Sequence, residues 1–262
     1  MKNIMTALIF TLCILSIVVG KIHWNQKINA ASNTANEKQA VVVEKKQQTE
    51  AEKFSTLTRH LPENLSEKIT NAKDENHPLK IVAVGSSATA EGSGTWTSIL
   101  QKRLDKAYGK GLFQISVESY GDDLSINVVQ QEKYTSVIEQ KPDIVLFEPF
   151  LLNDNGKVAI SNTLDSVEII TDRLKEASEQ IVIILQPPNP IHNAVHYPGQ
   201  VQALKEFAKE QQLIYLNHWS NWPDYESDEI LDYIDENSLP TTQGHQVWAD
   251  YIANYFTGEE LE

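Results

Sequence analysis

Cysteine is almost absent from this chain. Among 262 residues only Cys13 carries a thiol, and it lies within an apolar stretch at the amino terminus. A disulfide needs two cysteines and a cysteine-based metal site needs several, so one residue can form neither. The sequence therefore excludes both features from the soluble part of the chain.

Basic residues are also scarce. The formal net charge is −14, from 22 Lys and Arg against 36 Asp and Glu. The charge is uneven, because residues 1–54 hold seven Lys and four Glu and carry +3, which leaves −17 on the remainder. An acidic domain repels phosphate backbones and other anionic polymers. We therefore expect no nucleic-acid partner and a neutral or cationic substrate.

Long apolar runs are confined to the amino terminus. Residues 4–20 are mostly apolar and uncharged, and these 17 residues are just enough to cross a bilayer. Lys2 precedes the run, which favours an amino terminus on the cytoplasmic side. A cleaved signal peptide is the alternative, but the nearest small-residue cleavage site ends at Ala30, ten residues past the run. We expect residues 1–24 to be a single-pass anchor with the domain outside the cytoplasm, or the signal segment of a secreted protein.

Two further segments precede the predicted domain. From Asn25 to about Lys53 the chain is rich in Asn, Ala, Gln, Glu and Lys and offers little to bury, which is typical of an exposed stalk. Residues 54–72 then carry leucine or isoleucine every fourth position, the spacing of a helix, with an interruption near Pro62. We expect residues 25–77 to be a stalk and helical lead-in, and residues 78–262 to form the domain.

Within that domain, strand-like and helical patterns alternate. Short apolar runs typical of buried strands occupy residues 81–84, 113–117, 144–147, 181–185 and 213–216. Helical periodicities occupy residues 95–108, 125–139, 163–179, 201–211 and 242–256. This alternation predicts an α/β fold: a doubly wound, mostly parallel five-stranded sheet with helices on both faces, in a flavodoxin-like three-layer sandwich.

The first strand ends in the most informative segment. The run Ile81–Val84 stops at Gly85, and two hydroxyls follow at Ser86 and Ser87. Open α/β sheets bind their ligands at the carboxyl ends of the strands, and Gly85 allows a sharp turn there. A serine held at this edge has the setting of a nucleophile, although serines also cap helices in ordinary turns.

Two further strand ends carry groups of use in acyl transfer. The second predicted strand leads to Ser119-Tyr120-Gly121-Asp122, and the third leads to Glu148 and then to Asn153-Asp154. A glycine amide and an asparagine side-chain amide can both donate to an oxyanion, and neither titrates. The carboxyl ends of parallel strands share one edge, so we expect Gly121 and Asn153 to lie near Ser87.

These blocks resemble those of the SGNH/GDSL hydrolase family. Its Gly-Asp-Ser-Leu block is similar to Gly85-Ser86-Ser87-Ala88, its second block supplies a glycine that matches Gly121, and its Gly-x-Asn-Asp block is similar to Leu151-Leu152-Asn153-Asp154. The resemblance covers about residues 79–258. It implies that Ser87 is the nucleophile, that the amides of Ser87, Gly121 and Asn153 hold the oxyanion, and that no cofactor or metal takes part.

The resemblance fails at the catalytic base. The family ends in Asp-x-x-His-Pro followed by Gly-His, and alignment on Pro240 and Gly244 places Leu239 at the catalytic histidine. A serine hydroxyl without a base is a poor nucleophile at neutral pH. His245, at the start of the last helix, is the nearest substitute, and the alternatives are His218 or no base at all. Asp235, or its neighbour Glu236, is a candidate to orient that base.

The function expected from these residues is ester hydrolysis outside the cytoplasm through an acyl-serine intermediate. The substrate is a small-molecule or glycan ester, and an outward-facing anchor favours O-acetyl groups on a glycan. Two alternatives stay open: a glycan-binding module that kept the fold but lost catalysis, and acyl transfer to a glycan hydroxyl. The sequence does not indicate an oligomeric state.

Overall fold

The computed structural model describes residues 16, 18–27 and 51–258. The chain divides into two compact units, Met1–Ser55 and Thr56–Glu262. Residues 18–27 of the first unit are helical. No helix within the described ranges has both the length and the apolar character that a membrane crossing needs. The predicted anchor at residues 4–20 falls mostly outside these ranges, so it stays a prediction.

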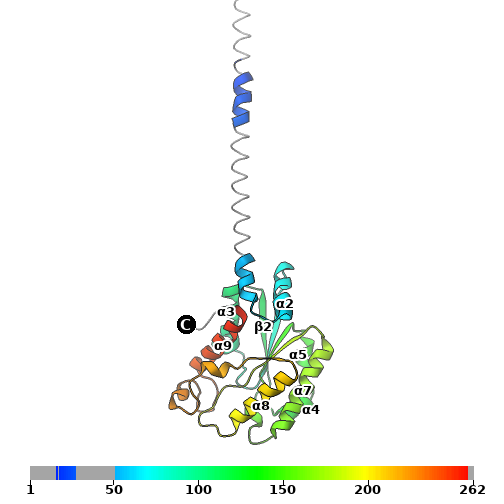
Figure 1. The fold of residues 1–262 in the computed structure, drawn as a ribbon, viewed down its shortest axis with the longest axis vertical. Coiled ribbons are helices and arrows are strands. Elements are labelled where there is room, and N and C mark those ends of the chain that lie inside the picture. The colour runs from blue at the N-terminus through cyan, green and yellow to red at the C-terminus, as the bar shows by residue number, and fades with distance from the viewer. Residues whose placement is uncertain (1–15, 17, 28–50, 259–262) are drawn as a thin grey trace, which may run out of the picture. The chain divides into compact units, whose positions relative to one another are not determined.

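The second unit contains one five-stranded parallel sheet (Figure 1), which confirms the predicted fold class. The strands are β1 (Leu79–Gly85), β2 (Phe113–Ser119), β3 (Ile144–Phe147), β4 (Val182–Leu185) and β5 (Ile214–Tyr215). They lie in the order β2-β1-β3-β4-β5, with Val84 of β1 opposite Phe147 of β3. The order reverses between β1 and β3, so the topological switch point of the sheet lies between these strands.

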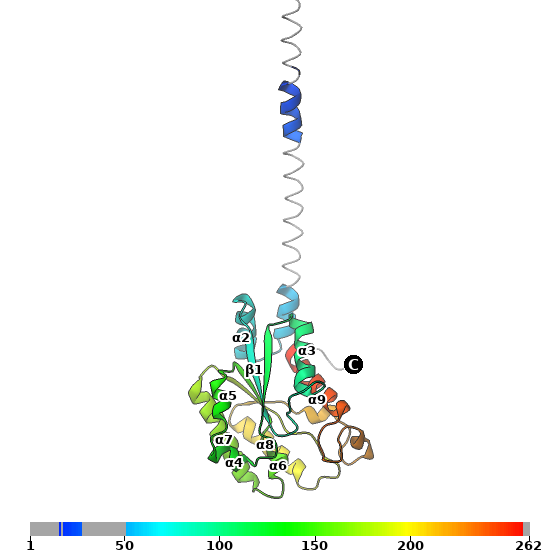
Figure 2. The ribbon, with the colours of Figure 1, turned by 180° about the vertical axis from the view of Figure 1, so that it is seen from behind.

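Helices cover both faces of the sheet, as Figures 1 and 2 show. On one face α3 (Trp96–Tyr108) packs against α9 (Thr242–Thr257), and Trp96 stacks on Trp248 with ring centroids 5.1 Å apart. On the other face lie α4 (Ser125–Gln130), α7 (Ile160–Ala177) and α8 (Tyr197–Glu210). Other elements are α2 (Glu63–Asp74), α5 (Thr135–Glu139), α6 (Leu151–Asp154), η1 (His218–Asn221) and η2 (Asp228–Asp232), and residues 51–58 are also helical.

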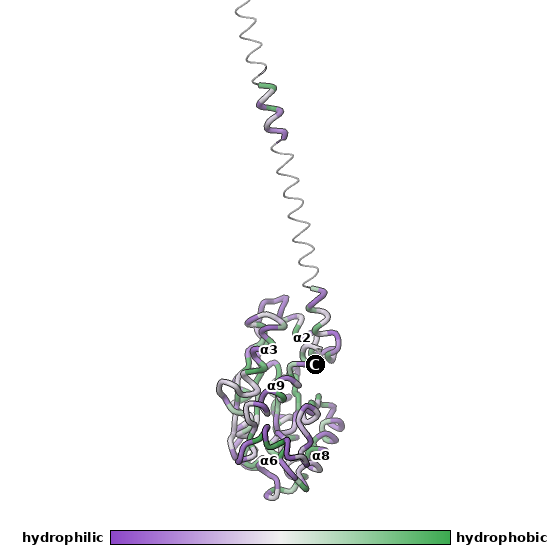
Figure 3. The backbone as a smooth tube through the Cα atoms, turned by 90° about the vertical axis from the view of Figure 1, so that its left-hand side faces the viewer, coloured by the Kyte–Doolittle hydropathy of each residue, from purple (hydrophilic) through white to green (hydrophobic). Residues whose placement is uncertain are grey.

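The core follows from the alternation of side chains along each strand. Val82 and Val84 of β1 pack with Val145 and Phe147 of β3 in the cluster beneath α4, α7 and α8. The intervening residues of each strand are equally buried and therefore face the layer of α3 and α9. Both faces are apolar, which is the pattern of a parallel sheet covered on both sides. Figure 3 shows hydrophobic and hydrophilic stretches alternating along the tube of this unit.

The structure corrects some predicted boundaries. The single helix predicted over residues 125–139 is two short helices, α4 and α5, separated by a turn in which Glu132 has φ of 50°. Helix α8 begins at Tyr197 instead of Val201, because Pro198 lies in its first turn, where a missing amide hydrogen costs no helical bond. The lead-in is indeed broken at Pro62, which caps α2.

Candidate active site

The candidate site lies at the carboxyl edge of the sheet, at the switch point between β1 and β3. Ser87 follows β1, Gly121 follows β2, and Asn153 lies in the short helix α6 that follows β3. The structure brings these three residues together through a single carbonyl group, that of Gly121. Their roles in catalysis stay predictions, but their proximity is a property of the fold.

A buried carboxyl group holds the turn that carries Ser87. Glu148 directly follows β3 and is fully buried. It accepts hydrogen bonds from the Ser86 amide at 3.0 Å, the Ser86 hydroxyl at 2.8 Å and the Thr89 hydroxyl at 2.7 Å. Burial raises the pKa of Glu148 to about 7, against an ordinary value of 4.5, while these bonds act in the opposite direction.

Gly85 is required by this contact. A Cβ atom at position 85 would lie 2.3 Å from Glu148 Oε2 and 2.7 Å from Thr89 Oγ1, far inside van der Waals contact. The glycine therefore allows the Glu148 carboxyl to reach beneath the end of β1. In this way β3 determines the conformation of the segment that presents Ser87.

Among the described residues, the Ser87 hydroxyl has one hydrogen-bond partner, a carboxylate. Ser87 is half-buried, and its Oγ donates to Asp122 Oδ1 over 3.0 Å. Asp122 is exposed and lies one residue after Gly121 in the turn that follows β2. The next residue, Asp123, forms an ion pair with Lys133. The two neighbouring aspartates therefore differ in contacts: one reaches the serine and the other a lysine.

The carbonyl oxygen of Gly121 is the meeting point of two donors. It accepts from the Ser87 amide at 3.1 Å and from Asn153 Nδ2 at 2.9 Å. The second hydrogen of Asn153 Nδ2 is donated to the Asp123 carbonyl, also at 2.9 Å. The Gly121 amide has no closer partner than Ser119 Oγ, at 3.5 Å. Two of the three predicted oxyanion donors, the Ser87 amide and Asn153, therefore converge, and their common acceptor is the carbonyl of Gly121.

The neighbour of Asn153 fixes its position. Asp154 is buried in α6 and accepts from the Ser125 amide at 3.0 Å and from the Thr163 hydroxyl at 2.6 Å. These bonds tie α6 to the starts of α4 and α7. Asn153 therefore sits on a short but well-anchored element beside the loop after β2.

His245, the predicted base, is hydrogen-bonded away from Ser87. Its Nδ1 accepts from the amide of Trp96 at 3.2 Å. In the neutral ring the other nitrogen, Nε2, then carries the hydrogen and cannot accept one. Burial also lowers the pKa of His245. The His245 side chain, which comes from α9, therefore lies against the start of α3, and no hydrogen bond joins it to Ser87 among the described residues.

His218, the second candidate, is a core residue. It is completely buried, stacks on Trp248 at 4.2 Å between ring centroids, and is hydrogen-bonded at both nitrogens. Nε2 donates to the Pro187 carbonyl at 2.8 Å, and Nδ1 accepts from Trp222 Nε1 at 2.9 Å. Burial lowers the pKa of His218 to about 3. Neither nitrogen is free to take a proton from a serine.

Asp235 and Glu236, the candidates to orient the base, lie in a surface turn. Asp235 Oδ1 accepts from the amides of Asn237 and Leu239, at 2.8 and 2.9 Å, and so closes a surface turn. Glu236 is exposed on the same turn. The structure does not bring Asp235 to His245, because no hydrogen bond or ion pair joins them among the described residues.

Two residues of the site were not assigned from the sequence. Asp122 directly follows the assigned Gly121, and Glu148 directly follows the third predicted strand. A signal for Glu148 was present, because a charged residue that immediately follows an all-apolar strand must be paired or hydrogen-bonded. Asp122 offered no comparable signal, since an aspartate in an exposed turn is ordinary.

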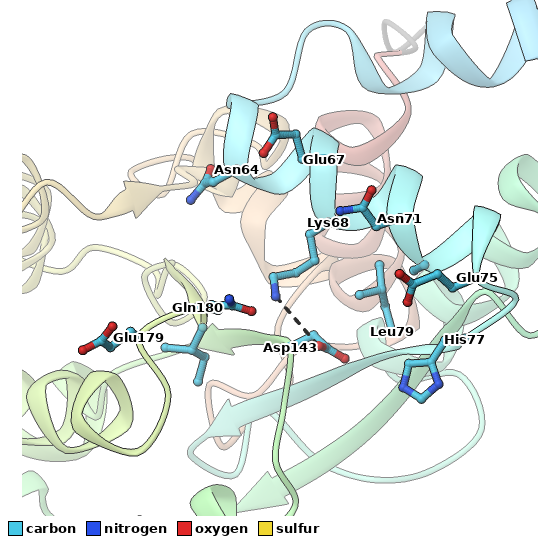
Figure 4. Close-up of a pocket in the computed structure, with 12 residues that line it drawn as sticks. Asn64, Glu67, Lys68, Asn71, Glu75, His77, Leu79, Asp143, Glu179 and Gln180 are labelled. Carbon is cyan, nitrogen blue, oxygen red and sulfur yellow. Dashed lines mark ion pairs between the residues drawn. The ribbon is translucent and has the colours of Figure 1, made fainter.

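A sizeable cavity lies elsewhere. It has a volume of about 540 Å³ and is formed by α2 together with the amino ends of β1, β3 and β4, where Lys68 approaches Asp143 at 3.8 Å (Figure 4). This is the edge of the sheet opposite to the one that carries Ser87. Within the described ranges no group of three or more His, Cys, Asp or Glu side chains is arranged to hold a metal ion.

Comparison with known proteins was informative only for structure. No protein-family model and no curated protein sequence matches the chain. Solved structures do match: a protein from Desulfitobacterium hafniense DCB-2, described as lipolytic and of the G-D-S-L family, superposes with a TM-score of 0.54 at 16% identity. That match covers 67% of this chain and 98% of the other.

Two esterases give matches of the same quality. An acetyl esterase mutant, solved with acetate ion, superposes with a TM-score of 0.57 at 15% identity, and a carbohydrate esterase of family 3 from Talaromyces cellulolyticus with 0.55 at 15%. Each match covers 67% of this chain and 94% of the other. At such identities the likeness establishes the fold, and the chemistry must be argued from the residues of this chain.

Proposed function

We propose that this chain, which has the fold of GDSL-family lipolytic proteins and acetyl esterases, is a serine ester hydrolase with Ser87 as its nucleophile. One observation carries the proposal. At the switch point of the sheet, the Ser87 hydroxyl donates a hydrogen bond to the Asp122 carboxylate. The Ser87 amide and the Asn153 side chain both donate to the carbonyl oxygen of Gly121. A nucleophile and two convergent donors are what acyl transfer by a serine needs.

The converging donors define where an oxyanion would be held. Their present acceptor is the carbonyl oxygen of Gly121, at 3.1 Å from the Ser87 amide and 2.9 Å from Asn153 Nδ2. As Ser87 attacks a bound ester, negative charge would develop on the carbonyl oxygen of the ester. That oxygen would then accept these two hydrogen bonds in place of the Gly121 carbonyl. The acyl group would pass to Ser87, and water would release it in a second step.

The charge and the structural neighbours support a neutral acyl substrate. The chain beyond residue 54 carries −17, which opposes an anionic ester. Solved structures of this fold include an acetyl xylan esterase and an acetyl-xylooligosaccharide esterase. We therefore propose a short acyl group, such as acetyl, on a neutral alcohol or glycan as the substrate class.

The proposed location is outside the cytoplasm. The support is the uncharged run of residues 4–20 and the lysine-bearing segment before it, which favour an uncleaved anchor. The test is expression of the full chain in bacterial cells followed by fractionation and protease treatment of intact cells. Recovery of the chain in the soluble cytoplasmic fraction would refute this part of the proposal.

Catalysis can be tested with a chromogenic ester and an active-site probe. Residues 56–262 form a compact unit, but the full chain in detergent avoids assuming that this unit folds alone. We expect hydrolysis of p-nitrophenyl acetate and labelling by a fluorophosphonate, both lost in Ser87→Ala. Ser220→Ala, at an exposed serine whose hydroxyl bonds only the Asn217 carbonyl, is the matched control and should keep both.

One observation favours a second function, a binding module without catalysis. No histidine among the described residues hydrogen-bonds to Ser87, although all seven histidines of the chain are described. A folded protein that neither hydrolyses the ester nor reacts with the probe, yet binds acetylated xylo-oligosaccharides in calorimetry, would establish this alternative. Absence of turnover, labelling and binding would refute both functions.

A further inference from the structure

Hydrolysis by Ser87 requires a group that takes the proton of its hydroxyl, and the histidines of this fold do not supply it. His218 is hydrogen-bonded at both nitrogens inside the core, and His245 uses Nδ1 to accept from Trp96. Two others contact groups elsewhere: His60 contacts the Tyr255 carbonyl, and His192 contacts the side chains of Asn193 and Asp228. His77 and His196 are exposed and have no hydrogen bond to Ser87.

The group that does contact the hydroxyl is Asp122. Asp122 Oδ1 accepts a hydrogen bond from Ser87 Oγ, and the two atoms lie 3.0 Å apart, the distance at which a general base acts. The contact depends on the turn after β2, where Gly121 adopts a left-handed φ of +58° and thereby directs the following residue toward Ser87. Among the described residues no Lys, Arg or His forms an ion pair with Asp122, whereas Lys133 is paired with Asp123.

We propose that Asp122 is the general base of the reaction, in place of the histidine that the fold usually carries; this rests on the proposed ester hydrolase function. As Ser87 Oγ bonds to the acyl carbon, its proton passes to Asp122 Oδ1 and the carbonyl π electrons move onto the oxygen. Collapse of the tetrahedral intermediate breaks the bond to the alcohol oxygen, which leaves with the proton from Asp122. The products of this half-reaction are the alcohol and acyl-Ser87.

The second half-reaction returns the enzyme to its starting state. A water molecule gives a proton to the Asp122 carboxylate as its oxygen bonds to the acyl carbon of acyl-Ser87. Collapse then breaks the bond between that carbon and Ser87 Oγ, which takes back the proton. The carboxylic acid is released, and no oxidant, metal or further reactant is needed. A carboxylate is a weaker base than imidazole, so turnover should be slow beside that of histidine-dependent serine hydrolases.

The direct test is Asp122→Asn, which keeps the shape of the side chain and removes its basicity. We expect kcat/KM for p-nitrophenyl acetate to fall by about 10²- to 10⁴-fold. Glu118→Gln is the matched control: it removes one negative charge at the end of β2, where the Glu118 carboxylate accepts from Gln140 instead of Ser87. This control should keep wild-type kcat/KM, and circular dichroism should show both variants folded.

A second measurement separates a chemical role from a structural one. Because Asp122 is exposed, its replacement by alanine leaves a space that a small carboxylate can enter from solvent. We expect formate to restore hydrolysis to Asp122→Ala in a concentration-dependent manner, whereas it should restore none to Ser87→Ala. If Asp122 only held the loop in place, formate would not restore hydrolysis to Asp122→Ala.

The outcomes distinguish the two proposals. If Ser87→Ala is inactive but Asp122→Asn keeps activity within about twofold of wild type, the base assignment is wrong and the ester hydrolase stands. Loss of activity in His245→Ala, with Asp122→Asn active, would assign the base to His245 and also overturn the inference. If the wild type neither hydrolyses the ester nor labels, the proposed function fails, and the inference fails with it.

Discussion

Ser87 and Asn153 donate to the same atom, the carbonyl oxygen of Gly121, at 3.1 and 2.9 Å. A carbonyl oxygen has two lone pairs and can accept both hydrogen bonds at once. The two donors together hold an oxygen with partial negative charge, here that of the loop's own carbonyl. A substrate would have to displace the carbonyl from these donors, so the loop after β2 competes with the ligand.

Replacement of Asn153 should affect catalysis more than binding. In Asn153→Ala the Gly121 and Asp123 carbonyls each lose a donor, and a developing oxyanion loses one as well. We expect kcat for p-nitrophenyl acetate to fall by about 10²- to 10³-fold with a smaller change in KM. Steady-state kinetics check this, with Asn237→Ala, an exposed asparagine on a surface turn, as control. Equal kcat in Asn153→Ala and wild type would contradict the assigned role.

Gly121 should tolerate asparagine better than alanine. Its φ of +58° is strained for most residues, whereas a Cβ there would meet Ser87 Oγ only at an ordinary 3.9 Å. The penalty is therefore a backbone penalty, about 1–2 kcal/mol for alanine and less for asparagine, which visits the left-handed region more readily. Urea unfolding of Gly121→Ala and Gly121→Asn measures it. Equal loss of stability in both variants would mean that the side chain, not φ, is the cause.

Glu148 should make the domain less stable as the pH rises from about 4.5 to about 7. Burial raises its pKa to about 7, above the 4.5 of an unfolded glutamate, so between these values the folded state holds a proton that the unfolded state has lost. The contribution is complete below pH 4.5 and is lost by about pH 7, at about 1.4 kcal/mol per pH unit. In denaturant unfolding, the wild-type free energy of unfolding should therefore fall relative to that of Glu148→Gln as pH rises from 4.5 to 7.

The glutamine variant is a suitable reference because it can keep the contacts of the turn. Its Oε1 can accept from the Ser86 amide and the Thr89 hydroxyl, while its Nε2 can donate to the Ser86 hydroxyl. A constant difference between the two proteins from pH 4.5 to 7 would show that Glu148 does not titrate abnormally. The comparison cancels the titration of all other groups, including His218.

Burial of His218 should make the domain less stable as the pH falls. Its pKa is lowered from 6.5 to about 3 by burial, so below pH 6.5 the unfolded state gains a proton that the folded state does not, and stability falls as pH falls. His218→Phe keeps the stacking on Trp248 and should remove this acid sensitivity. It leaves the Pro187 carbonyl and Trp222 Nε1 unpaired, at about 1–3 kcal/mol each at neutral pH.

Thermal and urea unfolding between pH 4 and 8 provide the measurement for His218. His196→Phe, at an exposed histidine before α8, should leave both neutral stability and the acid response unchanged. If His218→Phe unfolds with the same pH dependence as wild type, the buried histidine is not the source of acid sensitivity.

The sequence by itself determined the fold class and the strand ends at which the candidate site lies. Apolar runs alternating with helical periodicity are local signals, and in a parallel α/β sheet they leave few arrangements of the elements. The same local signals put Ser87, Gly121 and Asn153 at strand ends, and parallel strands gather their carboxyl ends at one edge. Even the correction to residues 125–139 concerned a turn within a helical region and did not move the site.

Only the tertiary structure decided which groups meet. Whether His245 faces Ser87 or the Trp96 amide depends on how α9 packs against α3, and whether His218 is free depends on its stacking against Trp248. The contact of Asp122 with Ser87 depends on the left-handed turn at Gly121. Sequence patterns report the spacing of residues along one element, whereas a hydrogen bond between two elements depends on the direction of each side chain after packing, which spacing alone does not contain.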